Sequence, residues 1–445
     1  MKIRLPSSPA RSLLTKLIGL GLEAVQAASA VRRAVIRRGD ELIIAPRRYD
    51  LRRYDRVVAV GAGKATAPMA RALERCLGSR LHSGLVVVKY GHAVPTAKIV
   101  VAEAGHPIPD RAGQRAAARL QSMVSALTSR DLLIVLLSGG ASSLLPAPVR
   151  GITLVDKQAT TDRLLRCGAT IQEINTVRKH LSTIKGGRLA ESTPATVVTL
   201  ILSDVLGDDL SAIASGPTAP DPTTYRDAVA ILRRYRIWRT VPPRVRQHLL
   251  QGQGGCLAET PKPRSSIFRQ VHHHVIGSNM IALTAVTRAA RDAGLRALVH
   301  SATLKGEARV AGERFGSIAR SIVNKRHPVP PPCCILAGGE TTVTVRGKGK
   351  GGRAQEFAVA AARKIAGLQR VWVAAIGTDG TDGPTNVAGA VVDGETTARA
   401  KRLGINLNHA LQRNNTYPAL KRLRCHITTG PTGTNVNDLY LLLVL

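Results

Sequence analysis

The sequence predicts an α/β fold whose larger part is a doubly wound, Rossmann-like sheet. Hydrophobic residues make up 44% of the 445 residues and aromatic residues only 3%, so the core must be built from aliphatic side chains, as in buried parallel strands. Aliphatic runs alternate with Ala- and Leu-rich stretches, which is the pattern of strand–helix–strand units. Glycine recurs where the aliphatic runs end, and ligands of such sheets bind beyond those strand ends.

The elements follow from the N-terminus onward. Leu13, Leu14, Leu17 and Leu20 recur at helical spacing, which predicts an amphipathic helix near the start of the chain. Charged residues interrupt the apolar part of this segment, so it does not resemble a signal peptide.

Strand and glycine-turn units fill the next part of the chain. Residues 55–77 predict a strand, a glycine turn and a helix, and residues 83–91 predict a strand and a turn. Residues 130–148 predict a strand, a glycine turn and a short helix. Residues 193–222 predict a strand and a long loop rich in Asp, Ser and Gly, and residues 277–302 predict a helix and then a strand.

A stretch rich in Gln, Gly and Pro at residues 251–266 predicts a domain boundary. We therefore expect an N-terminal Rossmann-like domain over residues 1–258 and a smaller α/β domain over residues 259–445. A second break at residues 324–334 precedes shorter pieces that are richer in strand-forming residues.

The chain carries 64 Lys and Arg against 29 Asp and Glu, a formal net charge of +35. The cations form short doublets rather than one tract, and few aromatic side chains are present to stack on bases, so the sequence disfavours a nucleic-acid partner. No apolar run approaches the roughly 18 residues of a membrane span. No cysteine belongs to a C-x-x-C pair, and we expect a cytoplasmic chain with reduced cysteines and no cysteine metal site. The cysteines are Cys76, Cys167, Cys256, Cys333, Cys334 and Cys425.

The first candidate motif is VAVGAGKATAPMA, in which Gly61 and Gly63 permit a tight turn before a helix. Lys64 is informative, because a cation just inside the positive end of a helix is unfavourable unless an anion binds there. The motif is neither a Walker loop nor a dinucleotide fingerprint, since Thr66 holds the third glycine position and the next strand ends in Lys89 rather than an acid. A plain strand-to-helix turn remains an alternative.

A second glycine turn, LLSGGASSLL, places Ser138, Gly139 and Gly140 at a strand end. Backbone amides and hydroxyls there could cradle a phosphate or carboxylate, and a capped turn is the alternative. Residues 173–190 predict a helix with Asn175 and Lys179 on one face. Its further cations, Arg178 and Lys185 among them, have a solvated helix face as their usual meaning.

Acidic residues are scarce, so their clusters are informative. Asp204, Asp208 and Asp209 follow an apolar strand, and Asp379 and Asp382 lie in the doublet GTDGTDG. Carboxylates of this kind hold magnesium in phosphoryl-transfer sites, whereas Asx turns and helix caps are the alternative. The three consecutive histidines at residues 272–274 predict a strand edge rather than a metal site, because consecutive side chains of a strand point to opposite faces.

The segment RGKGKGGRAQEF, residues 346–357, combines four cations with four glycines before an acid. It predicts a turn that joins a strand at residues 341–345 to a helix beginning near Arg353, with glycines that let the backbone approach an anion. Arg346, Lys348 and Lys350 would attract a triphosphate, and Arg353 could grip a carboxylate or phosphate. Together with the other glycine turns and acidic loops, this segment predicts an enzyme that handles phosphate with magnesium.

Several blocks in order, VGAGKA, GHPIPD, LLSGG, INTVRKHLS, GGETTVTVRGKGKGGR, GTDGTDGPT and GPTGTNVNDLYLLLV, resemble the glycerate 2-kinase family over nearly the whole chain. The resemblance implies ATP-dependent, magnesium-assisted phosphorylation of D-glycerate to 2-phosphoglycerate in a cleft between two domains. It implies a C-terminal MOFRL region at about residues 333–440 and leaves a homodimer open. It does not imply a membrane.

The resemblance implicates Lys64 and Arg353 in the active site, and Asp204 is our further catalytic candidate for orienting the glycerate hydroxyl. The magnesium (Mg²⁺) candidates are Asp208, Asp209 and Asp379. The substrate- and nucleotide-binding candidates are Gly61, Gly63, Ser138, Gly139, Gly140, Asn175, Lys179, Glu340, Thr432 and Asn435.

The sequence departs from the family pattern at Ala141, Ala354 and Asn386, where a glycine, an amide and an acid are usual. An alternative function is an NAD(P)H-dependent hydroxypyruvate reductase, a name often given to this family. The incomplete glycine fingerprint and Lys89 argue against it.

Overall fold

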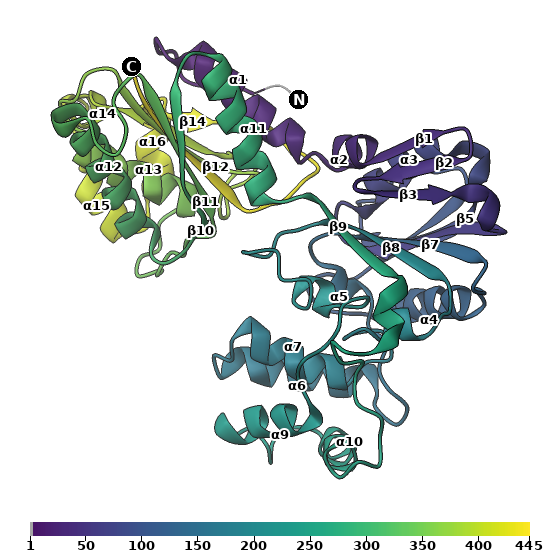
Figure 1. Cartoon of the computed structure of the whole chain (residues 1–445). Helices are drawn as coiled ribbons and strands as arrows, with labels where there is room; N and C mark the ends of the chain where they lie inside the picture. Colours follow the sequence, from purple (N-terminus) through teal and green to yellow (C-terminus); the bar gives the residue numbers. More distant parts are fainter. Residues whose placement is uncertain (1–2) are drawn as a thin grey trace. The chain divides into compact units, whose positions relative to one another are not determined.

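The structure, a computed structural model, describes residues 3–445 and separates into two compact units. The N-terminal unit comprises residues 27–276. The C-terminal unit comprises residues 277–445 together with the segment up to Gln26 (Figure 1). The predicted boundary at residue 258 lies before this division, because strand β9 (Val271–Gly277) still belongs to the sheet of the N-terminal unit. The prediction also placed the N-terminal helix in the wrong unit, since that helix packs on a helix of the C-terminal unit.

The N-terminal unit is built on a six-stranded sheet in the order β6-β5-β4-β7-β8-β9. Strands β6, β5, β4, β7 and β8 all run parallel to their neighbours. This order is that of a Rossmann fold, so the predicted doubly wound architecture is confirmed. Its topological switch point lies between β4 and β7. The strands are β4 (Arg56–Ala62), β5 (Leu81–Lys89), β6 (Ile99–Ala104), β7 (Asp131–Leu137), β8 (Thr196–Leu202) and β9.

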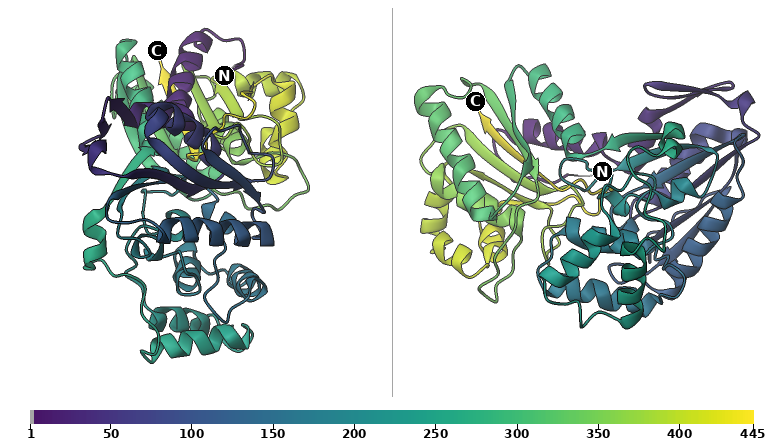
Figure 2. Two further views of the ribbon diagram at one scale, coloured as in Figure 1. Left: turned by 90° about the vertical axis from the view of Figure 1, so that its right-hand side faces the viewer. Right: turned by 60° about the horizontal axis from the view of Figure 1, so that its bottom comes forward.

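Aliphatic side chains of alternate strand residues form the core on one face of this sheet, together with residues of α4, α5 and α8. Helices α6, α7, α9 and α10 form a cluster of their own beside the sheet (Figure 2), packed around a second core that contains Tyr225. The helices of this unit are α2 (Ala27–Ala34), α3 (Thr66–Leu77), α4 (Arg111–Ser125), α5 (Ala141–Leu144), α6 (Leu154–Arg166), α7 (Ile171–His180), α8 (Arg188–Glu191), α9 (Tyr225–Arg234) and α10 (Pro243–Gln253).

Two features lie at the border of the sheet. The histidine triplet is part of β9, at the sheet edge as predicted: His273 bonds Thr218, whereas His272 bonds Tyr49 in the meander that precedes the sheet. That meander, β1 (Val35–Arg38), β2 (Glu41–Ile44) and β3 (Arg47–Asp50), was not predicted. Its four-residue strands are too short and too rich in charge to give a clear sequence pattern.

The C-terminal unit has a mixed sheet in the order β10-β11-β15-β12-β13-β14. Only the pair β10 and β11 is parallel, and every other neighbouring pair in this sheet is antiparallel. The strands are β10 (Arg296–Leu304), β11 (Cys333–Gly339), β12 (Val371–Gly377), β13 (Gly389–Asp393), β14 (His426–Ile427) and β15 (Asp438–Val444). The helices are α1 (Arg11–Ala24), α11 (Asn279–Asp292), α12 (Ala308–Lys325), α13 (Arg353–Lys364), α14 (Thr396–Arg402), α15 (Leu407–Gln412) and α16 (Thr416–Arg422).

Helices α12 and α13 pack on each other and on one face of this sheet, where Phe315 and Phe357 meet edge to face. Helix α1 packs on α11 and buries Leu14, Leu17 and Leu22, so the predicted amphipathic helix is confirmed. Over residues 3–445, no single helix has the length and apolar character of a membrane span, and only α1 and α2 taken together across their break reach both.

The contact between α12 and α13 yields a stability prediction. A Cβ on Gly312 would overlap the carbonyl oxygen of Phe357, so Gly312→Ala should lower the free energy of unfolding by about 1–3 kcal/mol despite the better helix propensity of alanine. Gly19→Ala is the matched control, because a Cβ there makes only an ordinary 3.5 Å contact with Ile3 and should stabilise α1 by about 0.5–1 kcal/mol. Urea denaturation measures both, and equal effects of the two substitutions would contradict the prediction.

Candidate active site

The first candidate cluster lies at the topological switch point of the N-terminal unit, where β4, β7 and β8 end. The backbone N–H of Lys64, after β4, donates to the carbonyl of Gly139, after β7, at 2.9 Å. A Cβ on Gly139 would overlap the carboxylate of Asp204, which follows β8. A Cβ on Gly140 would lie 3.3 Å from Lys64 Cε. The two glycines therefore allow a cation and a carboxylate from neighbouring strands to approach one turn.

His106, which follows β6, completes this cluster. Its ring lies 2.8 Å from the position of a Cβ on Gly140, beside the side chain of Lys64. Burial and the charges of Lys64 and Lys89 lower its pKa to about 4, so the imidazole is neutral at pH 7. Sequence analysis missed His106 as a site residue. Its signal was the block GHPIPD, which carried the family resemblance without an assigned role.

Other residues of the two glycine turns contact one another next to the cluster. Ser138 is buried, its hydroxyl accepts the N–H of Ala65 at 3.1 Å, and it lies 2.9 Å from the Thr66 hydroxyl. A Cβ on Gly63 would overlap the Ser138 hydroxyl, and a Cβ on Gly61 would overlap the backbone of the neighbouring strand β7. These contacts join β4 to β7, and the predicted ligand-binding role of Ser138, Gly61 and Gly63 stays a prediction.

The predicted helix over residues 173–190 ends at His180, and the chain turns again at Gly186 and Gly187, which have φ values of +60° and +85°. Its polar face is buried rather than solvated, so the expectation of a solvated face is wrong. Asn175 accepts the Ser215 hydroxyl at 2.9 Å, and Lys179 pairs with the fully buried Asp221 at 3.2 Å. Both side chains therefore bind protein partners in this structure.

Part of the acidic loop after β8 shapes turns. Asp208 has a φ of +55°, and Asp209 accepts the N–H of Ser211 at 2.9 Å. In the C-terminal unit, Asp379 accepts the N–H of Thr381 at 2.9 Å in the same manner. Across residues 3–445, no group of three His, Cys, Asp or Glu side chains is arranged to hold a metal ion. A metal held only by protein side chains therefore has no support, whereas a metal shared with substrate phosphates needs fewer carboxylates.

The second candidate cluster surrounds Arg353, the first residue of α13. Its Nε and Nη2 donate to the two carboxylate oxygens of Asp438 at 2.7 and 3.1 Å, and Nη1 donates to Glu340 at 2.6 Å. Burial disfavours the charged guanidinium, but the two carboxylates outweigh it and raise the pKa of Arg353. Complete burial raises the pKa of Asp438 to about 7, although Arg353 opposes that shift. Sequence analysis missed Asp438, because the carboxylate is recognisable only from its position opposite α13.

The basic glycine loop before Arg353 differs from its prediction. No strand forms at residues 341–345, where Thr342 makes a single bridge to Glu307. The loop packs on residues 413–416: Asn414 accepts the N–H groups of Arg346 and Gly347 at 2.7 and 3.0 Å. Cβ atoms on the loop glycines would overlap that segment or Asp382. The glycines therefore allow close backbone packing within the protein, and their predicted approach to an anion stays a prediction.

Two further loops complete this region. Asp382 accepts the N–H groups of Ala354 and Gln355 at 3.0 and 2.9 Å, so it caps α13. Thr432 donates to the carbonyl of Thr378 at 2.6 Å, and Asn435 accepts the N–H of Asn437 at 3.1 Å. The loop at 430–437 thus lies against the GTDGTDG loop, and the predicted binding role of Thr432 and Asn435 stays a prediction.

Comparisons with known proteins identify the family. Residues 13–250 match a family model described as a domain of unknown function, DUF4147, and residues 333–438 match the MOFRL family. The chain is 43% identical to the glycerate 2-kinase of Pyrococcus horikoshii over 98% of this chain and 97% of that protein. It is 43% identical to the D-glycerate 2-kinase of Thermotoga maritima over 88% of this chain and 91% of that protein. The chain belongs to the glycerate 2-kinase family.

Solved structures and a differently named relative add to this result. A crystal structure of the Pyrococcus horikoshii protein PH0495 has a TM-score of 0.90 with 42% identity, and covers 99% of each chain. A crystal structure of the Thermotoga maritima glycerate kinase has a TM-score of 0.88 with 40% identity, over 98% of this chain and 99% of that one. An Agrobacterium vitis relative, 45% identical over 87% of each chain, carries a provisional hydroxypyruvate reductase name.

The departures from the glycerate 2-kinase pattern have structural surroundings. Ala141 and Ala354 are both buried, and Ala354 still donates its backbone N–H to Asp382. Asn386 accepts a hydrogen bond from the Tyr417 hydroxyl at 3.0 Å. Arg353 keeps its hydrogen bonds to Asp438 and Glu340 beside Ala354.

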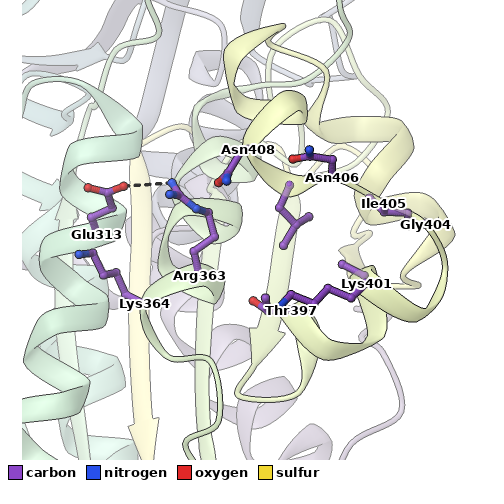
Figure 3. Close-up of a pocket in the computed structure, with 11 residues that line it drawn as sticks. Glu313, Arg363, Lys364, Thr397, Lys401, Gly404, Ile405, Asn406 and Asn408 are labelled. Atoms are coloured by element: carbon purple, nitrogen blue, oxygen red, sulfur yellow. Dashed lines mark hydrogen bonds and ion pairs between the residues drawn. The ribbon is translucent and has the colours of Figure 1, made fainter.

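A pocket of about 650 Å³ in the C-terminal unit lies apart from both clusters (Figure 3). Glu313 and Arg363 form an ion pair at its wall, and Lys401 lies across from them. It contains none of the residues that the family resemblance implicates. Its lining is Glu313, Arg363, Lys364, Thr397, Ala400, Lys401, Gly404, Ile405, Asn406, Leu407 and Asn408.

The two aspartates of GTDGTDG offer a matched test of the α13 cap. Asp382→Ala leaves buried N–H groups at the start of α13 without acceptors and should lower the free energy of unfolding by about 2–4 kcal/mol. Asp379→Ala removes only a turn contact at the surface and should cost less than about 1 kcal/mol. Denaturant unfolding of both variants measures the difference, and a cost for Asp379→Ala as large as that for Asp382→Ala would refute the assignment.

Proposed function

We propose that this protein transfers the γ-phosphoryl group of ATP to the 2-hydroxyl of D-glycerate, with magnesium. The observation that carries the proposal is the meeting of Lys64, His106 and Asp204 at the glycine turn of the switch point. Ligands bind at this point in Rossmann-like sheets. The glycerate 2-kinase names of full-length relatives support the same reaction.

Lys64 is suited to neutralise the transferring phosphoryl group. Within the described part of the chain its ammonium makes no hydrogen bond or ion pair, and it lies beside a neutral histidine rather than a competing cation. Phosphoryl transfer is accelerated mainly by positioning and by such charge neutralisation. Asp204, held against Gly139, is the carboxylate that would orient the glycerate hydroxyl and accept its proton.

Arg353 is a further candidate for binding an oxyanion, in the C-terminal unit. Its guanidinium has five N–H donors and uses three of them on Asp438 and Glu340. One N–H on each terminal nitrogen remains for an oxyanion of substrate, and the side chain is 32% exposed. Asp438 and Glu340 hold the guanidinium of Arg353 in one orientation. Bidentate recognition of a substrate carboxylate or phosphate requires such a fixed orientation.

Magnesium in phosphoryl transfer is held by one or two carboxylates and by the phosphates themselves. Asp208 and Asp209 lie in the loop after β8 and could supply those carboxylates, and Asp379 remains the candidate from the C-terminal unit. When bound, the ion would neutralise charge on the phosphates.

A hydroxypyruvate reductase activity is disfavoured by the same turn. Strand β5 ends in Lys89, where a dinucleotide site has an acid for the ribose. Thr66 occupies the position of the third glycine of a dinucleotide fingerprint. Its side chain is fully buried and hydrogen-bonded to Ser138.

The direct test is ADP release from ATP in the presence of D-glycerate, with and without magnesium. We expect glycerate- and magnesium-dependent turnover that Lys64→Met lowers at least 100-fold in kcat, because the phosphoryl charge is no longer neutralised. Lys401→Met, at an exposed position, should leave the rate unchanged. Folded wild type without glycerate-dependent ADP release, or with oxidation of NAD(P)H by hydroxypyruvate instead, would sink the proposal.

The fork geometry of Arg353 is tested by Arg353→Lys. The substitution keeps the charge but removes the paired donors, so kcat/KM should fall about 100-fold. The variant should still fold. Circular dichroism and thermal unfolding control for folding. A variant within threefold of the wild-type kcat/KM would show that charge alone suffices.

A further inference from the structure

Three cations lie in the helical cluster of the N-terminal unit, and two of them are buried. Lys157 lies on α6, Arg178 on α7 and Lys185 in the turn after α7 (Figure 1). Lys157 is 8% exposed and Lys185 is 3% exposed, and Arg178 is only partly exposed. Lys185 donates to the backbone and side-chain oxygens of Ser142 at 2.9 and 3.1 Å. The buried ammonium of Lys157 has no hydrogen-bond partner among residues 3–445.

No carboxylate compensates these charges. None of the three cations forms an ion pair within the part of the chain that the structure describes. Burial and Arg178 lower the pKa of Lys157 to about 7, and burial with Lys157 and Arg178 lowers that of Lys185 well below its usual value. Lys179, on the same helix α7, is equally buried but pairs with Asp221. The fold thus supplies a counter-ion to one buried lysine and withholds it from the other two.

An unpaired buried ammonium is costly, and an apolar side chain of the same length would fill the space at lower cost. The cost is removed when an anion enters and satisfies all three cations at once. The opening is at Arg178, the one member of the group that is not buried.

The cationic cluster connects directly to the switch point. The Ser142 hydroxyl accepts a hydrogen bond from Lys185. Ser142 lies two residues beyond Gly140, and the side chains of Lys64 and His106 lie close to Gly140. The Ser142 hydroxyl lies 2.9 Å from that of Ser215. Lys185 therefore links the three cations to the turn that carries the switch-point cluster.

We propose that Lys157, Arg178 and Lys185 bind the carboxylate of the hydroxy-acid substrate. This inference rests on the proposed glycerate kinase function. A terminal carboxylate can be met by cations from one side, whereas an inner phosphate of a nucleotide is substituted on both sides. A terminal phosphate shares the oxyanion chemistry, so the test separates the two sources.

The test is equilibrium binding of D-glycerate, ADP and inorganic phosphate to the full-length protein by titration calorimetry. Lys157→Met should weaken D-glycerate about 10- to 100-fold and leave ADP within twofold, since hydrogen bonds to a charged group are of that strength. Arg166→Met, an exposed cation on the same helix α6, should change neither. Arg178→Gln serves as a second variant, with the same expected result, should Lys157→Met not fold.

A proton balance provides an independent signature. At pH 8 the free Lys157 is mostly neutral, and a bound anion raises its pKa, so D-glycerate binding should take up a proton. Arg178 and Lys185 are the charged groups that act on Lys157; Asp156 beside it caps α6 through Thr153, and Asp221 is occupied by Lys179. Titrations in two buffers of different ionisation heat measure the uptake, which Lys157→Met should abolish.

The outcomes are distinct. If folded Lys157→Met binds D-glycerate with the affinity and the proton uptake of the wild type, the proposal is overturned. This holds even if the wild type phosphorylates glycerate. Weakened ADP with unchanged D-glycerate would overturn the carboxylate assignment. A wild type that binds D-glycerate through Lys157 but releases no ADP would leave the subsite standing and refute the kinase function instead.

Discussion

The close approach of β4, β7 and β8 at their carboxyl ends is the constraint on which the N-terminal cluster depends. Parallel strands on either side of a switch point send their chains to opposite faces, which opens space above the sheet. Gly139 and Gly140 keep that space open, because their missing Cβ atoms leave room for Asp204, Lys64 and His106. The cation and the carboxylate both lie beside this turn, and both are half-buried.

The C-terminal unit fixes Arg353, its candidate site cation, by a different route. Helix α13 starts against the sheet, and Asp382 satisfies its first N–H groups. Arg353 is thereby held at the helix start, and Asp438 and Glu340 fix its guanidinium in one orientation. The glycine-rich loop before it packs on its own unit, so the order of this cluster does not require a bound ligand.

The parts that sequence analysis predicted correctly are those with local signals. Aliphatic runs that end in glycine predicted the parallel strands, and topology then placed Lys64, Gly139 and Asp204 at one edge. The meander β1–β3 and the antiparallel order of the second sheet were missed, because pairing of short strands is decided by distant partners. Lys157 and Asp438 were missed for a related reason: their importance comes from burial, and burial of a charged residue leaves no mark in its immediate sequence.

The placement of carboxylates explains how a chain of net charge +35 can still offer specific anion sites. Every carboxylate that is buried among residues 3–445 is already engaged. Asp131 pairs with Arg56, Asp221 with Lys179 and Asp438 with Arg353, while Asp382 caps a helix and Glu356 bonds Asn414. Among the buried lysines of residues 3–445, Lys179 has an acidic partner, whereas Lys157 and Lys185 form no ion pair. Under the proposed function, an anionic substrate would supply the counter-charge that these two lysines lack, and its binding should be strongest where the fold itself provides no acid.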